Sequence, residues 1–254
     1  MNSVADRNKT DDTSKAIRID DVCKTFGQRA VLHNLSFNMN AAEAVFLCGI
    51  NGAGKSTLLR IVAGILSPDS GSVQINGHDI HKNPDTAKSQ LGIISHKSMV
   101  YPDLTVSENL LFFAALYGVP DRQKRVDELL EEVALSAYRY DPAGILSRGL
   151  LQRLSIARAM VHKPSILLAD EPFTGLDTQA CHYLVAVFDR FTNTGGTIIM
   201  TSHDIGMALR NCGRVVVLDK GGIIFDQAKA ALDITSFSQD YLSYARNSEC
   251  DISG

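Results

Sequence analysis

Residues 49–57 read GINGAGKST, and this segment restricts the possible folds more than any other part of the chain. It continues an apolar, strand-like run that begins at residue 44, and it leads into a segment at 55–66 with apolar residues at helical spacing. The pattern G-x-x-x-x-G-K-[ST] between a strand and a helix is typical of a loop that binds phosphate groups. We therefore expect the strand, loop and helix to form one phosphate-binding unit.

The chemistry of this loop comes from its backbone and from three side chains. Its glycines allow a tight turn, so that N–H groups and the helix N-terminus face an anionic phosphate. We expect Lys55 to bridge the β- and γ-phosphates, Ser56 to bind Mg²⁺ and Thr57 to reach the α-phosphate. The alternative is a glycine-rich turn with Lys55 in solvent. The residues predicted to bind nucleotide here are Gly49, Asn51, Gly52, Ala53, Gly54, Lys55, Ser56 and Thr57.

Two carboxylates follow a second apolar strand, which is predicted at 165–170. Parallel strands deliver their last residues to a site at the carboxyl edge of the sheet. We expect Asp170 to lie on the Mg²⁺ side of this site. Glu171 is then the predicted general base, which orients and polarises the attacking water. The alternative is an acidic first turn of the next helix, stabilised by the helix dipole.

A histidine follows a third apolar strand, at 196–202, in the same manner. Lone histidines at strand ends are more often structural than catalytic. Because His203 comes after both carboxylates in a chain with strand-end chemistry, we expect it to be a catalytic residue.

Strands and helix-length segments alternate along most of the chain. Further strands are predicted at 17–22, 72–77, 91–95 and 214–219. This alternation predicts an α/β fold with a mostly parallel sheet. Residues from 107 onward have helical periodicity with no strand between them. The expected divisions are a disordered leader at 1–16, a single domain at 17–240 with a helical subdomain at about 107–162, and a flexible tail at 241–254.

Composition excludes several classes of protein. The 254 residues are 45% hydrophobic and 21% charged, with a net charge of -3, so a nucleic acid partner is not expected. The five cysteines are scattered and have no metal-ligand spacing. No apolar run approaches the roughly 20 residues that cross a bilayer. Any membrane role is therefore expected to depend on a partner.

With GINGAGKST, LSRGLLQR, ILLADEP, FTGLD and TSHD in this order, the chain resembles the ATP-binding cassette (ABC) ATPases over about 17–226. The resemblance implies the ABC type of P-loop NTPase fold, with an antiparallel β edge beside the parallel core. It implies ATP and Mg²⁺ as ligands. It also implies a head-to-tail pair of ATPase subunits, here expected to be a homodimer, in which each ATP lies between the phosphate loop of one subunit and the signature segment of the other.

Residues 146–160, LSRGLLQRLSIARAM, occupy the place of that signature segment. By resemblance, Ser147 and Gly149 at the helix N-terminus hold the γ-phosphate bound to the partner. Arg148 stands where the family usually has a glycine, and Leu150 where it usually has a glutamine. We therefore expect a functional segment with an altered contact to nucleotide.

Three further residues take their roles from the same resemblance. Phe26 is expected to stack on adenine, and its alternative is a core phenylalanine. Asp177 is expected to help shape the opposite site, and it can also cap the following helix. His96 stands where the family usually has a glutamine that senses Mg²⁺ and the attacking water. Because imidazole titrates near neutrality, His96 is expected to add a pH dependence to ATP hydrolysis.

The SRG signature, His96 and the segment at 100–119 resemble most the ATPase of haem exporters used in cytochrome c maturation. The expected partner is an integral membrane permease, contacted near 99–111, and the expected location is the cytoplasmic face of the cell membrane. The alternatives are another small ABC exporter, for a drug, lipid or polysaccharide, or a soluble ABC protein of translation or DNA maintenance. A phosphate-loop kinase is a third alternative.

Overall fold

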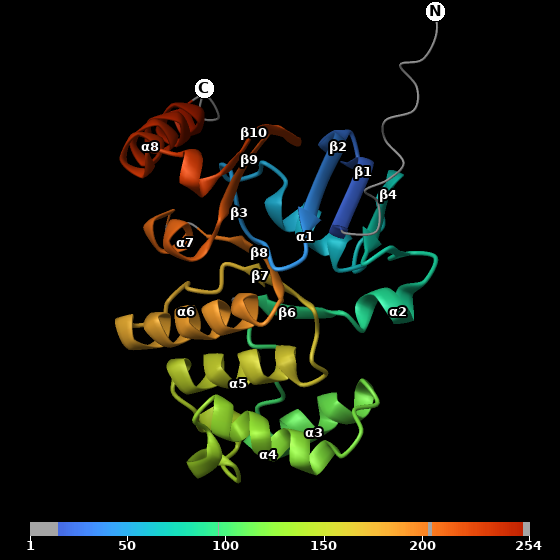
Figure 1. The fold of residues 1–254 in the computed structure, drawn as a ribbon, viewed down its shortest axis with the longest axis vertical. Helices are drawn as coiled ribbons and strands as arrows, with labels where there is room; N and C mark the ends of the chain where they lie inside the picture. The colour runs from blue at the N-terminus through green and yellow to red at the C-terminus, as the bar shows by residue number, and fades with distance from the viewer. Residues whose placement is uncertain (1–14, 96, 203–204, 251–254) are drawn as a thin grey trace, which may run out of the picture.

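The structure is a computed structural model that describes residues 15–95, 97–202 and 205–250. It consists of a body with two sheets and a helical part at one end (Figure 1). Within the described residues, no helix has the length and apolar character needed to cross a membrane.

The larger sheet is mostly parallel, as the alternation of strands and helices predicts. Its parallel strands are nearly continuous buried apolar runs, which is typical of a sheet covered on both faces. Only the edge strand β10 runs antiparallel, to β9. In order across the sheet, the strands are β10 (Gly222–Ala228), β9 (Arg214–Asp219), β3 (Ala44–Cys48), β8 (Thr197–Thr201), β7 (Ile166–Asp170) and β6 (Leu91–Ser95).

The other four strands form a second sheet, which is antiparallel throughout its pairings. Helix α1 (Lys55–Val62) packs between the two sheets, in a core with apolar residues of both. One face of the smaller sheet is buried against this helix, and the side chains of its other face are more exposed to solvent. In order across this sheet, the strands are β2 (Arg29–Asn40), β1 (Lys15–Phe26), β4 (Ser70–Ile75) and β5 (His78–Asp79).

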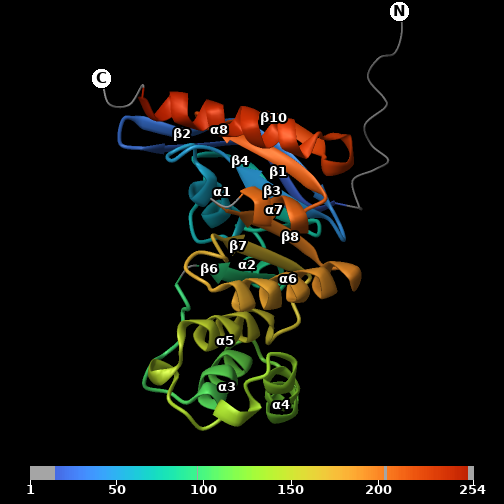
Figure 2. The ribbon, with the colours of Figure 1, turned by 90° about the vertical axis from the view of Figure 1, so that its left-hand side faces the viewer.

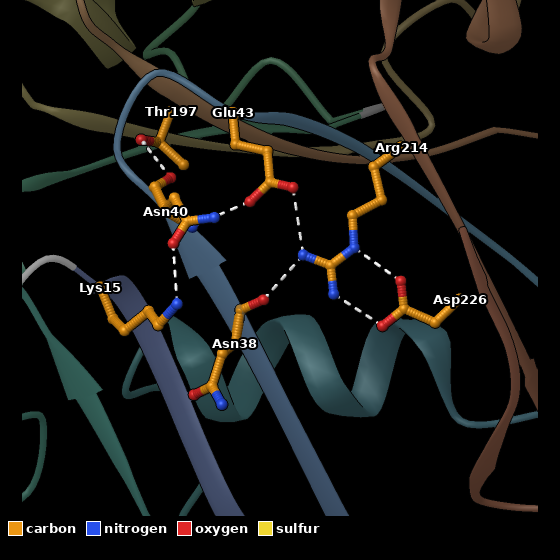
Figure 3. A network of polar contacts seen from close by, with 7 residues as sticks. All are labelled: Lys15, Asn38, Asn40, Glu43, Thr197, Arg214 and Asp226. Atoms are coloured by element: carbon orange, nitrogen blue, oxygen red, sulfur yellow. Dashed lines mark hydrogen bonds and ion pairs between the residues drawn. The ribbon is translucent and has the colours of Figure 1, made fainter. Parts of the chain in front are cut away.

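Arg214, the first residue of β9, ties the two sheets together (Figure 3). Its guanidinium binds both carboxylate oxygens of Asp226 on β10, each at 2.6 Å. It also donates to the Asn38 carbonyl oxygen on β2 at 2.9 Å and to Glu43 at 3.1 Å. These bonds, led by the one to Asp226, raise the pKa of Arg214. Such bidentate pairs fix geometry, and this one holds β10 on β9 while the same guanidinium reaches β2 of the other sheet.

The other face of the parallel sheet is covered by helices that share a second apolar core. These helices are α6 (Thr178–Asn193), α7 (Ile205–Asn211) and α8 (Ile234–Cys250). Helix α8 continues to Cys250, so residues 241–250 are helical where we expected a flexible tail. Aromatic residues hold α8 on the body: Phe225 of β10 lies 5.5 Å from Phe237 of α8 between ring centroids.

The helical part has its own apolar core. Its helices are α3 (Val106–Leu116), α4 (Arg122–Glu132) and α5 (Arg148–Met160), and the short α2 (Pro84–Lys88) precedes it. Thr105 and Glu108 form a reciprocal capping box at the start of α3. Figures 1 and 2 both show α5 lying between the sheet region and the α3–α4 pair. The signature segment is therefore placed where the helical part meets the body.

Candidate nucleotide-binding site

The phosphate loop connects β3 to α1 and is wedged between neighbouring strands. A Cβ atom on Gly49 would lie 2.3 Å from the Leu218 carbonyl oxygen of β9. A Cβ atom on Gly54, which has φ +108°, would lie 2.8 Å from the Leu32 side chain of β2. Both distances are shorter than any real contact of a Cβ atom, so this path of the loop requires glycine at both positions.

Lys55, the first residue of α1, folds back over the loop. Its Nζ donates to the carbonyl oxygens of Gly49 at 2.7 Å and Ile50 at 3.0 Å. Burial lowers the pKa of Lys55, and the negative charges of Glu171 and Asp170 oppose that shift. The ammonium group thus lies between the loop and the strand-end carboxylates.

A cavity of about 420 Å³ joins most of the predicted residues. The aromatic ring of Phe26 borders it at the end of β1 and is 49% exposed, which argues against a core role. Lys24 Nζ lies 5.6 Å from the centroid of the same ring. The residues that line the cavity are Phe26, Arg29, Val31, Asn51, Gly52, Gly54, Lys55, Ser56, Thr57, Asp170 and Glu171.

The two carboxylates lie at the end of β7, where parallel register aligns them with the end of β8. Thr201, the last residue of β8, is fully buried and donates to Asp170 Oδ1 at 2.7 Å. The same Thr201 hydroxyl accepts from the Glu171 backbone N–H at 3.1 Å. One hydroxyl therefore orients the Asp170 carboxylate and positions the backbone of Glu171.

Glu171 begins a tight turn and has φ +53°, a conformation that is uncommon for a residue with a side chain. Thr174 closes the turn: its N–H donates to the Glu171 carbonyl oxygen at 3.2 Å, and its hydroxyl lies 3.4 Å from Glu171 Oε2. Such strain is common at functional sites. The turn keeps the Glu171 side chain at the cavity.

The oxygen donors of the cavity suit Mg²⁺. Ser56 and Asp170 both line it, and Mg²⁺ is usually held by one or two protein oxygens together with substrate phosphates. In the part of the chain that the structure describes, no group of three or more His, Cys, Asp or Glu residues could hold a metal without such help. The residues present thus fit a metal that arrives with a nucleotide.

The signature segment lies outside this cavity. Ser147 caps α5 by accepting from the Leu150 N–H at 3.4 Å, and none of the described residues of α5 lines the phosphate-loop cavity. Asp177 caps α6 by accepting from the Ala180 N–H at 2.7 Å. Gly149 and Asp177 are likewise absent from the cavity lining. A single chain therefore presents the phosphate loop and the signature segment as two separate surfaces.

Arg148 contacts the turn that follows Glu171. Its guanidinium donates to the Thr174 carbonyl oxygen at 2.9 Å. A Cβ atom on Gly175 would lie 2.0 Å from that guanidinium, so the Arg148 side chain occupies the space beside a glycine. The unusual arginine of the signature segment thus binds the body of its own subunit.

The model of the ABC transporter family matches residues 32–174, which is more than half of the chain. This chain belongs to the ABC transporter family. The fold is that of the ABC ATPases, with a parallel core, an antiparallel sheet and helices. As an ATP-binding subunit of an ABC transporter it binds ATP with Mg²⁺ and hydrolyses ATP.

Two named relatives are similar over most of this ABC ATPase. The linearmycin resistance ATP-binding protein LnrL of Bacillus subtilis (strain 168) is 33% identical over 210 residues, which are 82% of this chain and 68% of the relative. The Nod factor export ATP-binding protein I of Paraburkholderia xenovorans (strain LB400) is 37% identical over 229 residues, which are 89% of this chain and 75% of the relative.

Solved structures of ABC subunits have the same fold. CbiO1 from Clostridium perfringens, described as part of the transporter complex cbiONQ, has a TM-score of 0.78 and 25% identity, and the match covers 90% of this chain and 93% of CbiO1. MJ0796, a dimer in a post-hydrolysis state bound to ADP and phosphate, has a TM-score of 0.75 and 25% identity, with coverage of 85% and 100%.

Two predicted catalytic residues, His96 and His203, lie outside the described residues. Two further residues of the site, Arg29 and Thr201, have no predicted role in the sequence. Arg29 lines the cavity because it pairs with Phe26 across the β1–β2 turn, a pairing that the short Gly27–Gln28 link could have indicated. Thr201 precedes His203 in the TSHD motif, and its place at a strand end was the available signal. The catalytic, binding and metal roles assigned to individual residues stay predictions.

Replacing Thr201 with valine should impair the Mg²⁺-dependent step. Loss of a hydrogen bond that orients a metal ligand typically costs about 10–100-fold in metal affinity or activity, so we expect Thr201→Val to lower kcat and raise the Mg²⁺ concentration for half-maximal activity by roughly tenfold or more. ATPase activity titrated with Mg²⁺ measures both. Thr197→Val is the matched control, because Thr197 is equally buried on β8 but bonds to Asn40 and Ala42. Equal losses in the two variants would contradict this role.

Because Arg148 contacts the turn that contains Gly175, substitutions at these two positions should have non-additive effects on ATP turnover. Gly175→Ala places a Cβ against the guanidinium, so the substitution should damage ATP turnover more in the native background than in Arg148→Gly. Arg148→Gly alone should lower kcat about threefold, the effect of one modest hydrogen bond, and leave the ATP dissociation constant unchanged. Steady-state kinetics of the two single variants and the double variant measure the coupling. Strict additivity would mean that Arg148 does not act on this turn.

Proposed function

We propose that this ATPase powers export through a separate membrane permease, as one half of a head-to-tail pair of identical chains at the cytoplasmic face of the membrane. The pairing is supported by the separation of the signature segment from the phosphate-loop cavity within one chain. Ser147 and Gly149 lie on α5, while the cavity is lined by β1, β2, the phosphate loop and the end of β7. A second copy would supply the signature segment to the open side of each cavity.

The proposed cycle follows from this separation. ATP that contacts both chains favours the closed pair, because it binds that state more tightly than the open one. Within this chain, Lys55 would contact the β- and γ-phosphates, Ser56 and Asp170 would hold Mg²⁺, and Glu171 would take a proton from the attacking water. Once the γ-phosphate bond is broken, the difference in affinity disappears and the pair reopens. Phe26 would stack on adenine, and Asp177 would contribute to the opposite site.

An apolar patch supports a permease contact. Tyr101 packs edge-to-face against Phe112 at 5.2 Å between ring centroids, yet the two residues are 48% and 43% exposed. Met99 and Leu116 nearby in the sequence are also exposed. Exposed apolar clusters of this kind often mark protein interfaces. The patch lies in the region where sequence analysis predicts contact with a cytoplasmic helix of the permease.

Two cargo classes compete. The names of the relatives, one for Nod factor export and one for linearmycin resistance, favour a small exporter of the drug, lipid or polysaccharide group. The haem exporter of cytochrome c maturation is the second candidate, and its support is the sequence resemblance at the SRG signature, His96 and the segment at 100–119. We propose the first class. No haem ligand in this chain is needed for either, because the cargo would pass through the permease.

Co-purification tests the proposal. Tagged Glu171→Gln, isolated from gently solubilised native membranes with ATP present, should retain a polytopic membrane protein together with a second copy of this chain, because loss of the base holds the closed state. Mass spectrometry identifies the partner, and its identity separates a haem permease from others. Recovery only in the soluble fraction, alone or with ribosomes, would contradict the proposal.

The aromatic patch provides a specific control for that experiment. Tyr101→Asp should release the membrane protein while keeping the second ATPase copy, because it places a charge in the apolar patch only. Tyr140→Asp changes another exposed tyrosine of the helical part, 79% exposed, that makes none of the ring contacts of the patch. Equal retention of the permease by both variants would show that the contact lies elsewhere.

A further inference from the structure

Helix α8 reaches back to the phosphate loop through one side chain. The Gly49 backbone N–H donates to the hydroxyl oxygen of Tyr241 at 2.9 Å, across 192 residues of sequence. Gly49 is the first residue of the loop and does not line the nucleotide cavity. Tyr241 does not line the cavity either, so the bond reaches the loop at a residue outside the nucleotide cavity.

The position of Tyr241 is fixed by aromatic packing. Its ring lies 6.1 Å from Phe237, one helical turn earlier, and Phe237 in turn packs on Phe225 of β10. Tyr241 joins the apolar core on this face of the sheet. Burial raises the pKa of the Tyr241 phenol, so that a neutral hydroxyl faces Gly49 over the whole physiological range. Aromatic packing thus gives the hydroxyl a defined place.

Gly49 is held on each side. Its N–H binds Tyr241, its carbonyl oxygen accepts from Lys55 Nζ at 2.7 Å, and its Cα lies against the Leu218 carbonyl with no room for a Cβ. Lys55 is the residue predicted to contact the phosphates. The hydroxyl of Tyr241 is therefore two hydrogen bonds away from the ammonium group of the site.

We propose that Tyr241 is a positioning residue for nucleotide binding, and that docking of α8 sets the affinity of the phosphate loop for ATP. Tyr241 does not touch the nucleotide. It fixes the entry of the loop before ATP arrives, so that less ordering is needed on binding, and preorganisation of this kind increases affinity. This inference rests on ATP binding alone and is independent of the proposed export function.

Tyr241→Phe removes the hydroxyl and keeps the ring. The bond is present without ATP, so the affinity changes only by the part of its free energy that differs between the free and bound states. We expect the ATP dissociation constant to rise about threefold, below the roughly tenfold limit set by one neutral hydrogen bond, with KM rising in parallel and kcat at saturating ATP changing less than about twofold. The measurement is calorimetric titration of the full chain with ATP and Mg²⁺, followed by steady-state kinetics. Tyr183→Phe is the matched control, because Tyr183 is also half-buried but donates to the Glu132 carbonyl in the helical part.

A second substitution tests whether α8 acts through this hydroxyl. Phe237→Leu loosens the packing of the helix and should also weaken ATP binding. In the Tyr241→Phe background the same substitution should have little further effect on ATP affinity, although it still lowers the melting temperature. An unchanged or tighter ATP dissociation constant in Tyr241→Phe would overturn the proposal. So would additive effects of the two substitutions, or an equal effect of Tyr183→Phe.

Discussion

The phosphate loop is packed closely between the two sheets, and this packing determines where the catalytic groups can lie. Gly49 lies against the Leu218 carbonyl of β9, and Gly54 lies against Leu32 of β2, with no space for a Cβ at either position. The conformation of the loop therefore depends on contacts with one strand of each sheet, β9 and β2. Arg214, which joins β9 to β2 and β10, stabilises that arrangement away from the site.

The chemistry follows from where the loop is held. Strands β7 and β8 are paired in parallel register and end at the phosphate loop. Asp170 and Thr201, the last residues of these strands, are therefore direct neighbours, and their side chains form a hydrogen bond. The turn after Glu171 connects the body to the signature helix. The Thr174 hydroxyl bonds to the Glu171 carboxylate, and the Thr174 carbonyl oxygen accepts from Arg148 at the start of α5. One short path of hydrogen bonds thus joins the predicted base to the surface that a second subunit would bind.

Short sequence patterns indicate those parts of the structure that lie within one continuous segment of the chain. The loop, the strand that delivers Asp170 and the helical subdomain each have a period or a spacing that one segment contains. The bond from Thr201 to Asp170 and the bond from Gly49 to Tyr241 join residues that are 31 and 192 apart, and no local pattern encodes such partners. Residues 241–250, which we expected to lie in a flexible tail, continue α8, and this helix packs on β10 near its start through Phe237 and Phe225. In proteins, helices are stabilised mostly by such packing, which a local sequence pattern does not show.

The loop and the strand-end carboxylate are expected to form one site for ATP with Mg²⁺. The most direct test is the ATP dissociation constant, measured with Mg²⁺ and with excess chelator, for the native chain and for Asp170→Asn. We expect Mg²⁺ to tighten ATP binding in the native chain and most of this gain to be lost in Asp170→Asn. An equal gain from Mg²⁺ in both proteins would contradict it.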